Sequence, residues 1–244
     1  MDLHCHILPG VDDGAEDLTE ALAMLRIARD SGVTEMAATP HFPGVMESVR
    51  LLQKLYARLR RLEDAARREG IDVTLYPGAE VLCLPQTVEL AQAQLLPTLG
   101  DSRCVLLEFH FDTPFAVMDD LLEKIAGFGY LPVVAHPERY EAILDDPRGV
   151  RKWFADGYII QLNKGSILGH FGYSIRKTAQ WILEGGLAHL VASDGHSARQ
   201  RTPDMHRVRQ ALEDLCPMDY VYILLEENPA RLIRGQGPVP VQEL

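Results

Sequence analysis

Seven short apolar segments recur along the chain and alternate with stretches of helical periodicity. They lie near residues 1–8, 34–39, 71–76, 103–109, 130–135, 158–162 and 187–193. Most are continuously apolar and do not alternate between apolar and polar residues, which is typical of strands covered on both faces. Strands that alternate with helices in this way form a parallel sheet. The pattern therefore predicts an α/β fold.

The length of the chain favours one closed unit. A chain of 244 residues, of which 47% are hydrophobic, is long enough to form one α/β barrel and to fill its core. No internal repeat, low-complexity tract or linker-like segment divides it, so we predict a single domain over residues 1–244. Seven strand–helix units favour a distorted, TIM-like (β/α)7 barrel, although an open doubly wound sheet would give the same pattern.

The composition excludes several classes of protein. A net charge of −11 and a pI near 5.2 argue against a nucleic-acid-binding surface, which needs basic patches. No segment approaches the ~18 apolar residues of a membrane span, and the start of the chain lacks the features of a secretory signal. The four cysteines are scattered without C-x-x-C spacing, which suits reduced thiols. We therefore expect a cytoplasmic protein that neither binds nucleic acid nor inserts into a membrane.

Most of the predicted strands end in a side chain that can bind a metal. These side chains are His4, His6, His41, Glu80, Glu108, His136, Asp194 and His196. In parallel α/β folds the carboxyl ends of the strands share one face, so residues spread over the whole chain should converge there. Burying so many charged groups without partners would be costly, which favours a metal site at this face over ordinary core packing.

The loop after the first strand adds a carboxylate. His4 and His6 are two residues apart, so in a strand both face one side and Cys5 faces the other. We therefore expect no metal role for Cys5. Asp12 and Asp13 follow in the next turn. We expect that only one of them faces the site, and spacing does not decide which.

Adding one of these carboxylates to the eight strand-end side chains gives nine nitrogen or oxygen ligands and no thiolate. Nine ligands are too many for one zinc ion and would satisfy three divalent ions that share carboxylates. Histidine and carboxylate ligands suit Mn, Fe or Zn. Clustered metal ions lower the pKa of a bridging water and stabilise an anionic transition state, so phosphate-ester hydrolysis is the leading function.

Two arginines follow ligand-bearing strands. Arg139 comes three residues after His136, and Arg201 comes five residues after His196. A guanidinium can bind two phosphate oxygens at once, although position alone also suits a surface ion pair. No cysteine has an arginine six residues later, and the chain contains neither G-x-S-x-G nor a P-loop. These absences argue against a cysteine phosphatase, a serine hydrolase and a P-loop enzyme.

Several strings of residues resemble a known family. They are H-x-H near the start, T-P-H, HILPGVDDGAED, GAEV, LLEF, AHPERY and ASDGH. In order and spacing they resemble the PHP (polymerase and histidinol phosphatase) superfamily. Within it they are similar to the bacterial CpsB/CapC family of manganese-dependent protein-tyrosine phosphatases, from about residue 1 to Arg231.

The resemblance implies a (β/α)7 barrel with three divalent ions, manganese before iron or zinc, and a role for each candidate residue. The residues implied for the first ion are His4, His6, Glu80 and Asp194. Those implied for the second are Glu80 as a bridge, Glu108 and His136. Those implied for the third are Asp13, His41 and His196, which selects Asp13 over Asp12. Arg139 and Arg201 match the family's phosphate-binding arginines.

The resemblance also implies an activity. We expect a protein-tyrosine phosphatase in which a metal-activated hydroxide attacks phosphorus directly, acting on a bacterial tyrosine kinase that regulates capsular or exopolysaccharide synthesis. One alternative is a small-molecule phosphatase, for example for histidinol phosphate, which the HILPGVDDG string disfavours. Another is a non-catalytic, metal-stabilised binding module, which the full set of nine ligands disfavours.

Overall fold

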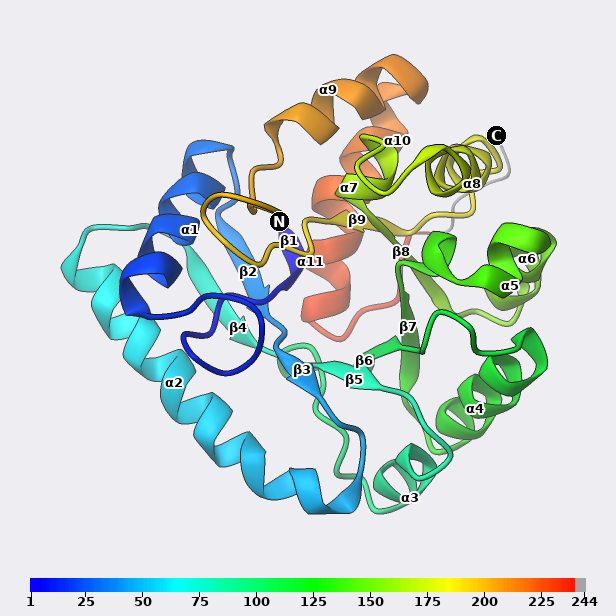
Figure 1. The fold of residues 1–244 in the computed structure, drawn as a ribbon, viewed down its shortest axis with the longest axis horizontal. Helices are drawn as coiled ribbons and strands as arrows, with labels where there is room; N and C mark the ends of the chain where they lie inside the picture. Colours follow the sequence, from blue (N-terminus) through cyan, green and yellow to red (C-terminus); the bar gives the residue numbers. More distant parts are fainter. Residues whose placement is uncertain (240–244) are drawn as a thin grey trace.

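The computed structural model describes residues 1–239, and shows parallel strands surrounded by helices (Figure 1). The strands are β1 (Asp2–Cys5), β2 (Glu35–Ala38), β3 (His41–Phe42), β4 (Thr74–Pro77), β5 (Glu80–Leu82), β6 (Cys104–Glu108), β7 (Leu131–Ala135), β8 (Ile159–Asn163) and β9 (Leu190–Ala192). Every strand pairing among the described residues is parallel, which confirms the α/β prediction. The predicted single domain includes residues 240–244, which lie outside the described residues, and it stays a prediction.

Helices follow most of the strands. They are α1 (Leu18–Asp30), α2 (Val49–Arg68), α3 (Thr87–Gln92), α4 (Phe115–Gly127), α5 (Glu141–Asp145), α6 (Arg148–Ala155), α7 (Lys164–Ile167), α8 (Tyr173–Glu184), α9 (His206–Leu215), α10 (Met218–Tyr222) and α11 (Asn228–Ile233). The sequence patterns did not predict α5 and α7, which are each about one turn long. None of the helices within residues 1–239 is long and apolar enough to cross a membrane.

The helix ends follow local sequence signals. Asp17 precedes α1, and its side chain accepts a hydrogen bond from the backbone N–H of Glu20 at 2.9 Å, which satisfies a free donor of the first turn. Gly70 follows α2 with a φ of +65°, a left-handed conformation that glycine adopts without strain. These signals set where α1 begins and where α2 ends, and the two helices pack against each other.

The strands form two sheets, β1-β2-β4 and β3-β5-β6-β7-β8-β9. Strands β2 and β3 follow one extended course that is interrupted at Pro40, and β4 and β5 follow another that is interrupted after Pro77. Proline has no backbone N–H to donate to the hydrogen bonds of a sheet. If each interrupted path is counted once, the nine strands occupy the seven predicted positions. A parallel bridge between Cys5 and Gly195, with a hydrogen bond from the His6 N–H to the Gly195 oxygen at 2.8 Å, links β1 to the segment after β9. The strands thus follow one another around a ring, although they do not share one continuous ladder.

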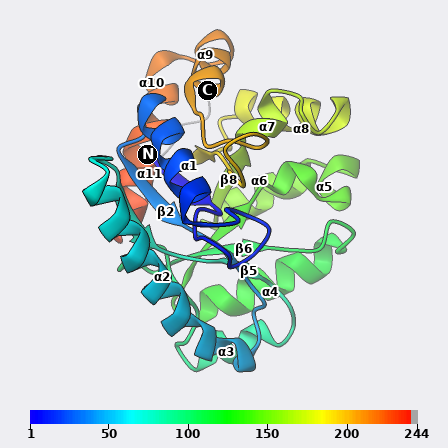
Figure 2. The ribbon, with the colours of Figure 1, turned by 60° about the vertical axis from the view of Figure 1, so that its left-hand side comes forward.

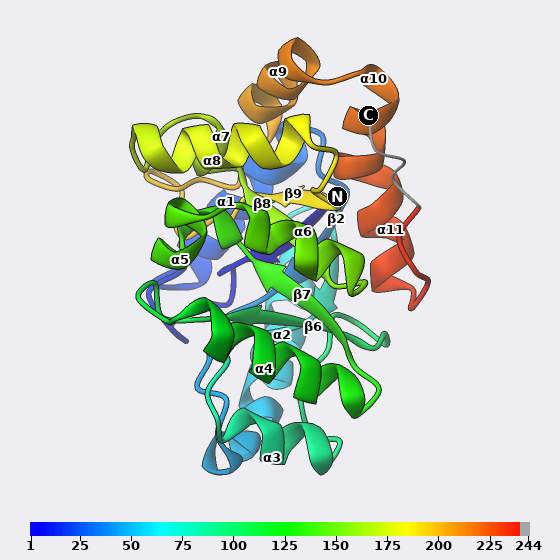
Figure 3. The ribbon, with the colours of Figure 1, turned by 90° about the vertical axis from the view of Figure 1, so that its right-hand side faces the viewer.

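Alternate strand residues face two apolar clusters. In β6, Cys104 and Leu106 belong to the smaller cluster, whereas Val105 and Leu107 belong to the larger one. The smaller cluster takes residues from six strands but helical residues only from α11, so it lies inside the ring. The larger cluster packs the strands against the outer helices. Figure 3 shows α4, α6 and α8 in front of the strands and α11 at the right-hand edge, beyond one end of the strands.

The two ends of the ring are covered differently. Helix α11 packs at the amino ends of the strands, where Cys104, the first residue of β6, lies with its Sγ 3.7 Å from the Leu232 oxygen. The carboxyl ends carry loops instead. Figure 2 shows the longest of the early loops, between β1 and α1, in front of the central strands. The fold therefore leaves the carboxyl ends for the polar side chains that follow the strands.

Candidate metal centre

The strand-end side chains meet at the carboxyl ends of the strands. They form four overlapping groups whose nitrogen and oxygen atoms lie within 4.8 Å of one another. The groups are His6–Asp13–His41–His196, His4–His6–Asp194, His4–Glu80–His136 and His41–Glu80–Glu108. Each of the nine residues predicted as ligands belongs to at least one group. Cys5 is fully buried and belongs to none of the groups found among residues 1–239.

Glu80 lies at the centre of the cluster. Its carboxylate is 1% exposed and contacts four imidazoles. Its Oε1 lies 3.2 Å from His4 Nε2 and 2.9 Å from His136 Nε2. Its Oε2 lies 3.2 Å from both His6 Nε2 and His41 Nδ1. One buried carboxylate therefore connects side chains from four different strands and loops.

Asp194 connects the cluster to the two predicted arginines. Its Oδ1 lies 3.6 Å from His4 Nε2 and 3.5 Å from His6 Nε2. Its Oδ2 accepts hydrogen bonds from Arg201 at 2.6 Å and Arg139 at 3.4 Å. Both arginines are thus paired with a buried carboxylate at the site, and are not in surface ion pairs.

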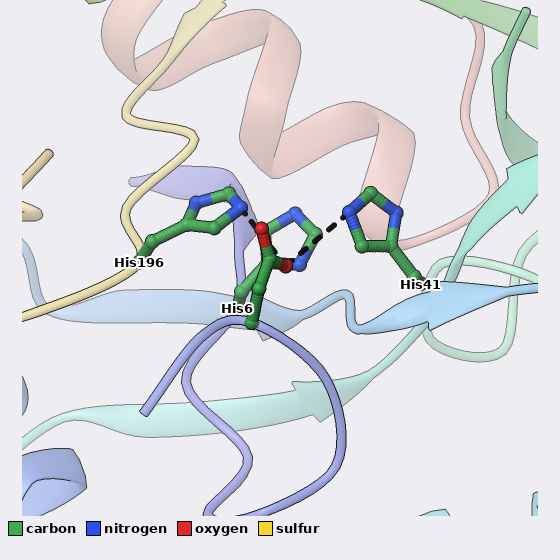
Figure 4. Close-up of side chains that lie close together, drawn as sticks. His6, His41 and His196 are labelled. Atoms are coloured by element: carbon green, nitrogen blue, oxygen red, sulfur yellow. Dashed lines mark ion pairs between the residues drawn. The ribbon is translucent and has the colours of Figure 1, made fainter. Parts of the chain in front are cut away.

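The outer edge of the cluster is open to solvent. Asp13 Oδ1 lies 3.5 Å from both His41 Nε2 and His196 Nε2, and Figure 4 shows the rings of His6, His41 and His196 turned toward one another. Glu108 Oε1 lies 2.9 Å from His41 Nδ1. The side chains of Asp13 and His41 are 65% and 41% exposed, so a substrate can reach this edge.

Hydrogen bonds on the outer side of the rings fix their tautomers. His4 Nδ1 lies 3.0 Å from Gln161 Oε1. Because Gln161 Nε2 donates to the Leu162 oxygen at 2.8 Å, it is the amide oxygen that faces His4. His4 Nδ1–H therefore donates outward, and in the neutral ring the Nε2 lone pair points into the cluster.

In His6 and His196 the Nδ1 atom also faces an oxygen outside the cluster. His6 Nδ1 lies 2.8 Å from Asp12 Oδ2, and His196 Nδ1 lies 2.9 Å from the Asp194 backbone oxygen. Inside the cluster, the Nε2 atoms of His4 and His6 are only 3.3 Å apart. Lone pairs that face each other and face carboxylates repel unless a cation lies among them. This donor set of imidazoles and carboxylates fits divalent metal ions.

Without a metal, protons would supply the positive charge. Burial disfavours charged imidazoles, but Glu80 and Asp194 outweigh it and raise the pKa of His4 to about 9. Against the same effect of burial, Asp12 and Glu80 raise the pKa of His6 to about 10. The imidazoles in turn hold the pKa of Glu80 well below its usual range, despite burial. Metal binding must displace these protons, so metal affinity should rise with pH.

Three residues of the site have left-handed backbone conformations. The φ angles are +33° at His136, +50° at Asp194 and +49° at Arg201. Such angles are uncommon outside glycine and strain the backbone, and they tend to occur where a side chain must be aimed. At these positions the chain turns sharply, and the side chains of His136 and Arg201 reach Glu80 and Asp194, respectively.

Asp12 and Asp13 lie on different sides of the cluster, and of the two only Asp13 belongs to a candidate ligand group among residues 1–239. The loop wraps around two rings, which lets the neighbouring carboxylates reach them from different sides. Asp12 contacts the outer nitrogen of His6, and also accepts the His41 backbone N–H at 2.8 Å. Asp13 contacts the inner nitrogens of His41 and His196.

Sequence reasoning missed two polar residues behind the cluster. Gln161 orients His4, and Asn163 Nδ2 donates to Asp194 Oδ2 at 2.5 Å. A signal existed for Gln161, because it is the one polar residue of the apolar segment 158–162 apart from the tyrosine hydroxyl. Lys164, to which the sequence assigned no role, donates to the backbone oxygens of Thr202 and Asp204 and anchors the loop after Arg201.

Arg139 is held between two aromatic rings. Its guanidinium carbon lies 4.7 Å from the centre of the Phe111 ring and 4.5 Å from that of Phe171. These two cation–π contacts restrict the guanidinium, which also reaches Asp194. Nothing in the spacing of the sequence indicated this arrangement.

Known proteins are similar to this chain in sequence and fold over almost its whole length. The family model for capsular polysaccharide synthesis proteins CpsB/CapC matches residues 1–234. Tyrosine-protein phosphatase YwqE of Bacillus subtilis is 33% identical over 238 residues, covering 97% of this chain and 92% of that protein. Tyrosine-protein phosphatase CpsB of Streptococcus pneumoniae is 29% identical over 242 residues, covering 97% of this chain and 99% of that protein.

A solved structure agrees with the sequence comparisons. It comes from work on crystal structures of YwqE from Bacillus subtilis and CpsB from Streptococcus pneumoniae, described as unique metal-dependent tyrosine phosphatases. It matches with a TM-score of 0.87 and 30% sequence identity, over 100% of this chain and 98% of that one. The chain therefore belongs to the CpsB/CapC family of capsular polysaccharide synthesis proteins.

Proposed function

We propose that this protein is a metal-dependent protein-tyrosine phosphatase. The observation that carries the proposal is the buried cluster, in which imidazole lone pairs and carboxylates face one another beside two arginines. The similarity to metal-dependent tyrosine phosphatases over the whole chain supports it. Hydrolysis adds water across the bond between phosphorus and the phenol oxygen, and yields tyrosine and inorganic phosphate.

We propose three divalent ions, with Mn²⁺ as the leading choice and Fe or Zn as alternatives. The ligands of the first ion would be His4, His6, Glu80 and Asp194. Those of the second would be Glu80, Glu108 and His136, and those of the third Asp13, His41 and His196. Asp13, His41 and His196 belong to one compact group, which supports the third set. Glu108 and His136 fall in separate groups that share Glu80, which supports Glu80 as a bridge.

The chain's own residues bind and orient the phosphoryl group. Bound metal ions would lower the pKa of a coordinated water and neutralise negative charge. Arg139 and Arg201, which both donate to the same oxygen of Asp194, would bind the phosphoryl oxygens and stabilise charge in the transition state. The phenol of tyrosine has a pKa of about 10, so the leaving group departs without a strong general acid.

We infer that the substrate is a tyrosine-phosphorylated segment of a bacterial tyrosine kinase that regulates capsular or exopolysaccharide synthesis. The family's link to capsular polysaccharide synthesis supports this partner. The exposed edge at Asp13 and His41 supports it as well, because a phosphotyrosine carried on another protein needs an open site.

Metal add-back provides the test. Protein stripped with a chelator is supplied separately with Mn, Zn, Mg, Fe or Co, and hydrolysis of a phosphotyrosine peptide and of histidinol phosphate is compared. We expect activity to vanish on chelation, to return with metal and to favour the peptide. Full activity after exhaustive chelation, or a trapped phosphoenzyme, would contradict the proposal. Preference for histidinol phosphate would favour a small-molecule phosphatase, and bound metal without turnover of p-nitrophenyl phosphate would favour a binding module.

A further inference from the structure

An apolar groove opens beside the metal centre. It has a volume of about 430 Å³ and lies between β3 and the loop that follows β6. Its lining residues are His41, Phe42, Pro43, Leu82, Glu108, Phe109, His110 and Phe111. A groove of this size and composition suits a small apolar group.

The groove is continuous with the cluster. His41 and Glu108 line the groove, and they also form a group with Glu80 whose ligand atoms lie within 4.8 Å of one another. A phosphoryl group bound at the cluster can therefore place its ester substituent in the groove. The substituent of phosphotyrosine is an aromatic ring, whereas that of phosphoserine is a single methylene that would leave the groove unfilled.

Phe111 lies at the border between the groove and the metal cluster. Its side chain is 44% exposed, although its ring lies 6.3 Å from the ring of His136 and carries the guanidinium of Arg139. Phe42 and Phe109, by contrast, are almost fully buried in the groove wall. Phe111 thus offers an aromatic surface to a ligand at the edge of the site, where pairs of aromatic rings attract each other in stacked or edge-to-face geometry.

We propose that this groove binds the aromatic ring of phosphotyrosine, and that Phe111 determines the preference for aryl over alkyl phosphate esters. The inference rests on the proposed phosphatase function and adds the part of the site that recognises the leaving group. It assigns the phosphoryl group to the metal centre and the arginines, and the ring to the groove.

Phe171 provides a matched control. Phe111 and Phe171 both contact Arg139, at 4.7 and 4.5 Å, but only Phe111 lines the groove. Phe171→Ala should loosen Arg139 and lower kcat/KM for every phosphate ester by the same factor. Phe111→Ala should do the same and also weaken binding of the ring. We therefore compare kcat/KM for an aryl ester with kcat/KM for an alkyl ester. Within one variant this ratio cancels the loosening of Arg139. Dividing it by the same ratio for the unmodified protein cancels the intrinsic reactivity of the esters.

We expect Phe111→Ala to lower this ratio about 10-fold, Phe171→Ala to leave it unchanged, and Phe111→Tyr to restore it. Inhibition constants of phenylphosphonate and methylphosphonate for the Mn-supplied protein give the same comparison without turnover of the inhibitor. Phe111→Ala should weaken phenylphosphonate about 10-fold more than methylphosphonate. Equal ratios in the two alanine variants would overturn the inference.

Failure of the proposed function would look different. If the unmodified protein hydrolyses no phosphate ester with any metal, the phosphatase proposal fails. The groove is then tested by calorimetric binding of the two phosphonates to the same metal-supplied protein. Tighter binding of phenylphosphonate that depends on Phe111 would support the groove, and equal binding would exclude it. Thermal melting of each variant verifies that it is folded.

Discussion

His189 and two histidines of the metal centre, His4 and His6, are similarly buried, but their surroundings are opposite in character. His189 is 6% exposed, accepts the Ile160 N–H through Nδ1 at 3.0 Å and stacks on Phe154 with ring centres 4.9 Å apart. Burial lowers the pKa of His189 to about 4, so its ring is neutral. In the centre, nearby carboxylates raise the pKa of His4 to about 9 and that of His6 to about 10, against the effect of burial.

The difference shows what separates a structural histidine from a ligand. His189 accepts a backbone donor, so its Nδ1 lone pair has a protein partner. His4 and His6 use Nδ1 as a donor to Gln161 and Asp12, which leaves the Nε2 lone pairs facing each other and Glu80. Burial alone does not reveal a ligand. An inward lone pair without a protein donor does.

The strongest test of this comparison is Glu80→Gln. Removing the central charge should lower kcat/KM for a phosphotyrosine peptide roughly 10³-fold, because a bound metal contributes several kcal/mol, and should reduce the bound metal. Glu138→Gln is the matched control. Glu138 is equally buried but belongs to no candidate ligand group among residues 1–239, and the amide oxygen of a glutamine can still accept the Asn163 backbone N–H, so this variant should have little effect. Kinetics and metal analysis that find the two variants alike would break the comparison.

The next largest effect is expected from Arg201→Gln. Loss of its guanidinium should lower kcat for the peptide about 100-fold, the usual effect of removing one donor to a developing oxyanion, while metal content stays unchanged. The control is Arg199→Gln, which changes an exposed residue of the same loop and should retain full activity. Metal loss in Arg201→Gln would instead show that the arginine maintains the cluster.

Asp12→Asn tests the outer hydrogen bonds. Asp12 Oδ2 accepts from both the His6 ring and the His41 backbone, and Oδ1 accepts the Gly14 N–H at 3.0 Å, whereas an amide has only one acceptor oxygen. Metal affinity, measured by competition with a chromogenic chelator, should fall about 10- to 100-fold, as for other partners of metal-binding histidines. Asp72→Asn changes an exposed carboxylate away from the cluster and should leave the affinity unaltered. Equal affinities in the two variants would refute the role of Asp12.

The smallest effect concerns His189 and pH. Because the folded pKa of about 4 lies below the ordinary value of 6.5, the unfolded chain binds the extra proton first as the pH falls. The contribution of His189 to stability is therefore complete above pH 6.5 and is lost toward pH 4. Between pH 7 and pH 5 the free energy of unfolding should fall by about 2 kcal/mol from this group. Urea unfolding of His189→Gln should lack this part of the pH dependence, and an identical slope would show that His189 titrates normally.

The position of the candidate ligands was predictable because it follows from topology. Side chains at the carboxyl ends of parallel strands meet wherever the strands close into a ring, so Glu80 and Asp194 contact the same two histidines, His4 and His6, despite more than a hundred intervening residues. The strand breaks at Pro40 and after Pro77 were less predictable, because the chain resumes the same path beyond each proline.

The supporting contacts could not be predicted from spacing. Gln161 and Asn163 lie on β8, but their hydrogen-bond partners lie elsewhere in the chain. Gln161 contacts His4 of β1, and Asn163 contacts Asp194, which follows β9. Such pairs depend on register across the ring, which the sequence does not state. The rings around Arg139 come from two separate loops, and only their packing brings them together.

The left-handed backbone at His136, Asp194 and Arg201 has an evolutionary consequence. Each of these conformations costs about 1–3 kcal/mol, a backbone strain that glycine would not carry. Selection for activity must therefore hold these side chains in place against the cost of the strain. In a lineage released from that selection, these residues should drift before the apolar core does. The expected descendant is a stable barrel-like protein that has kept its strands and lost its metal ligands.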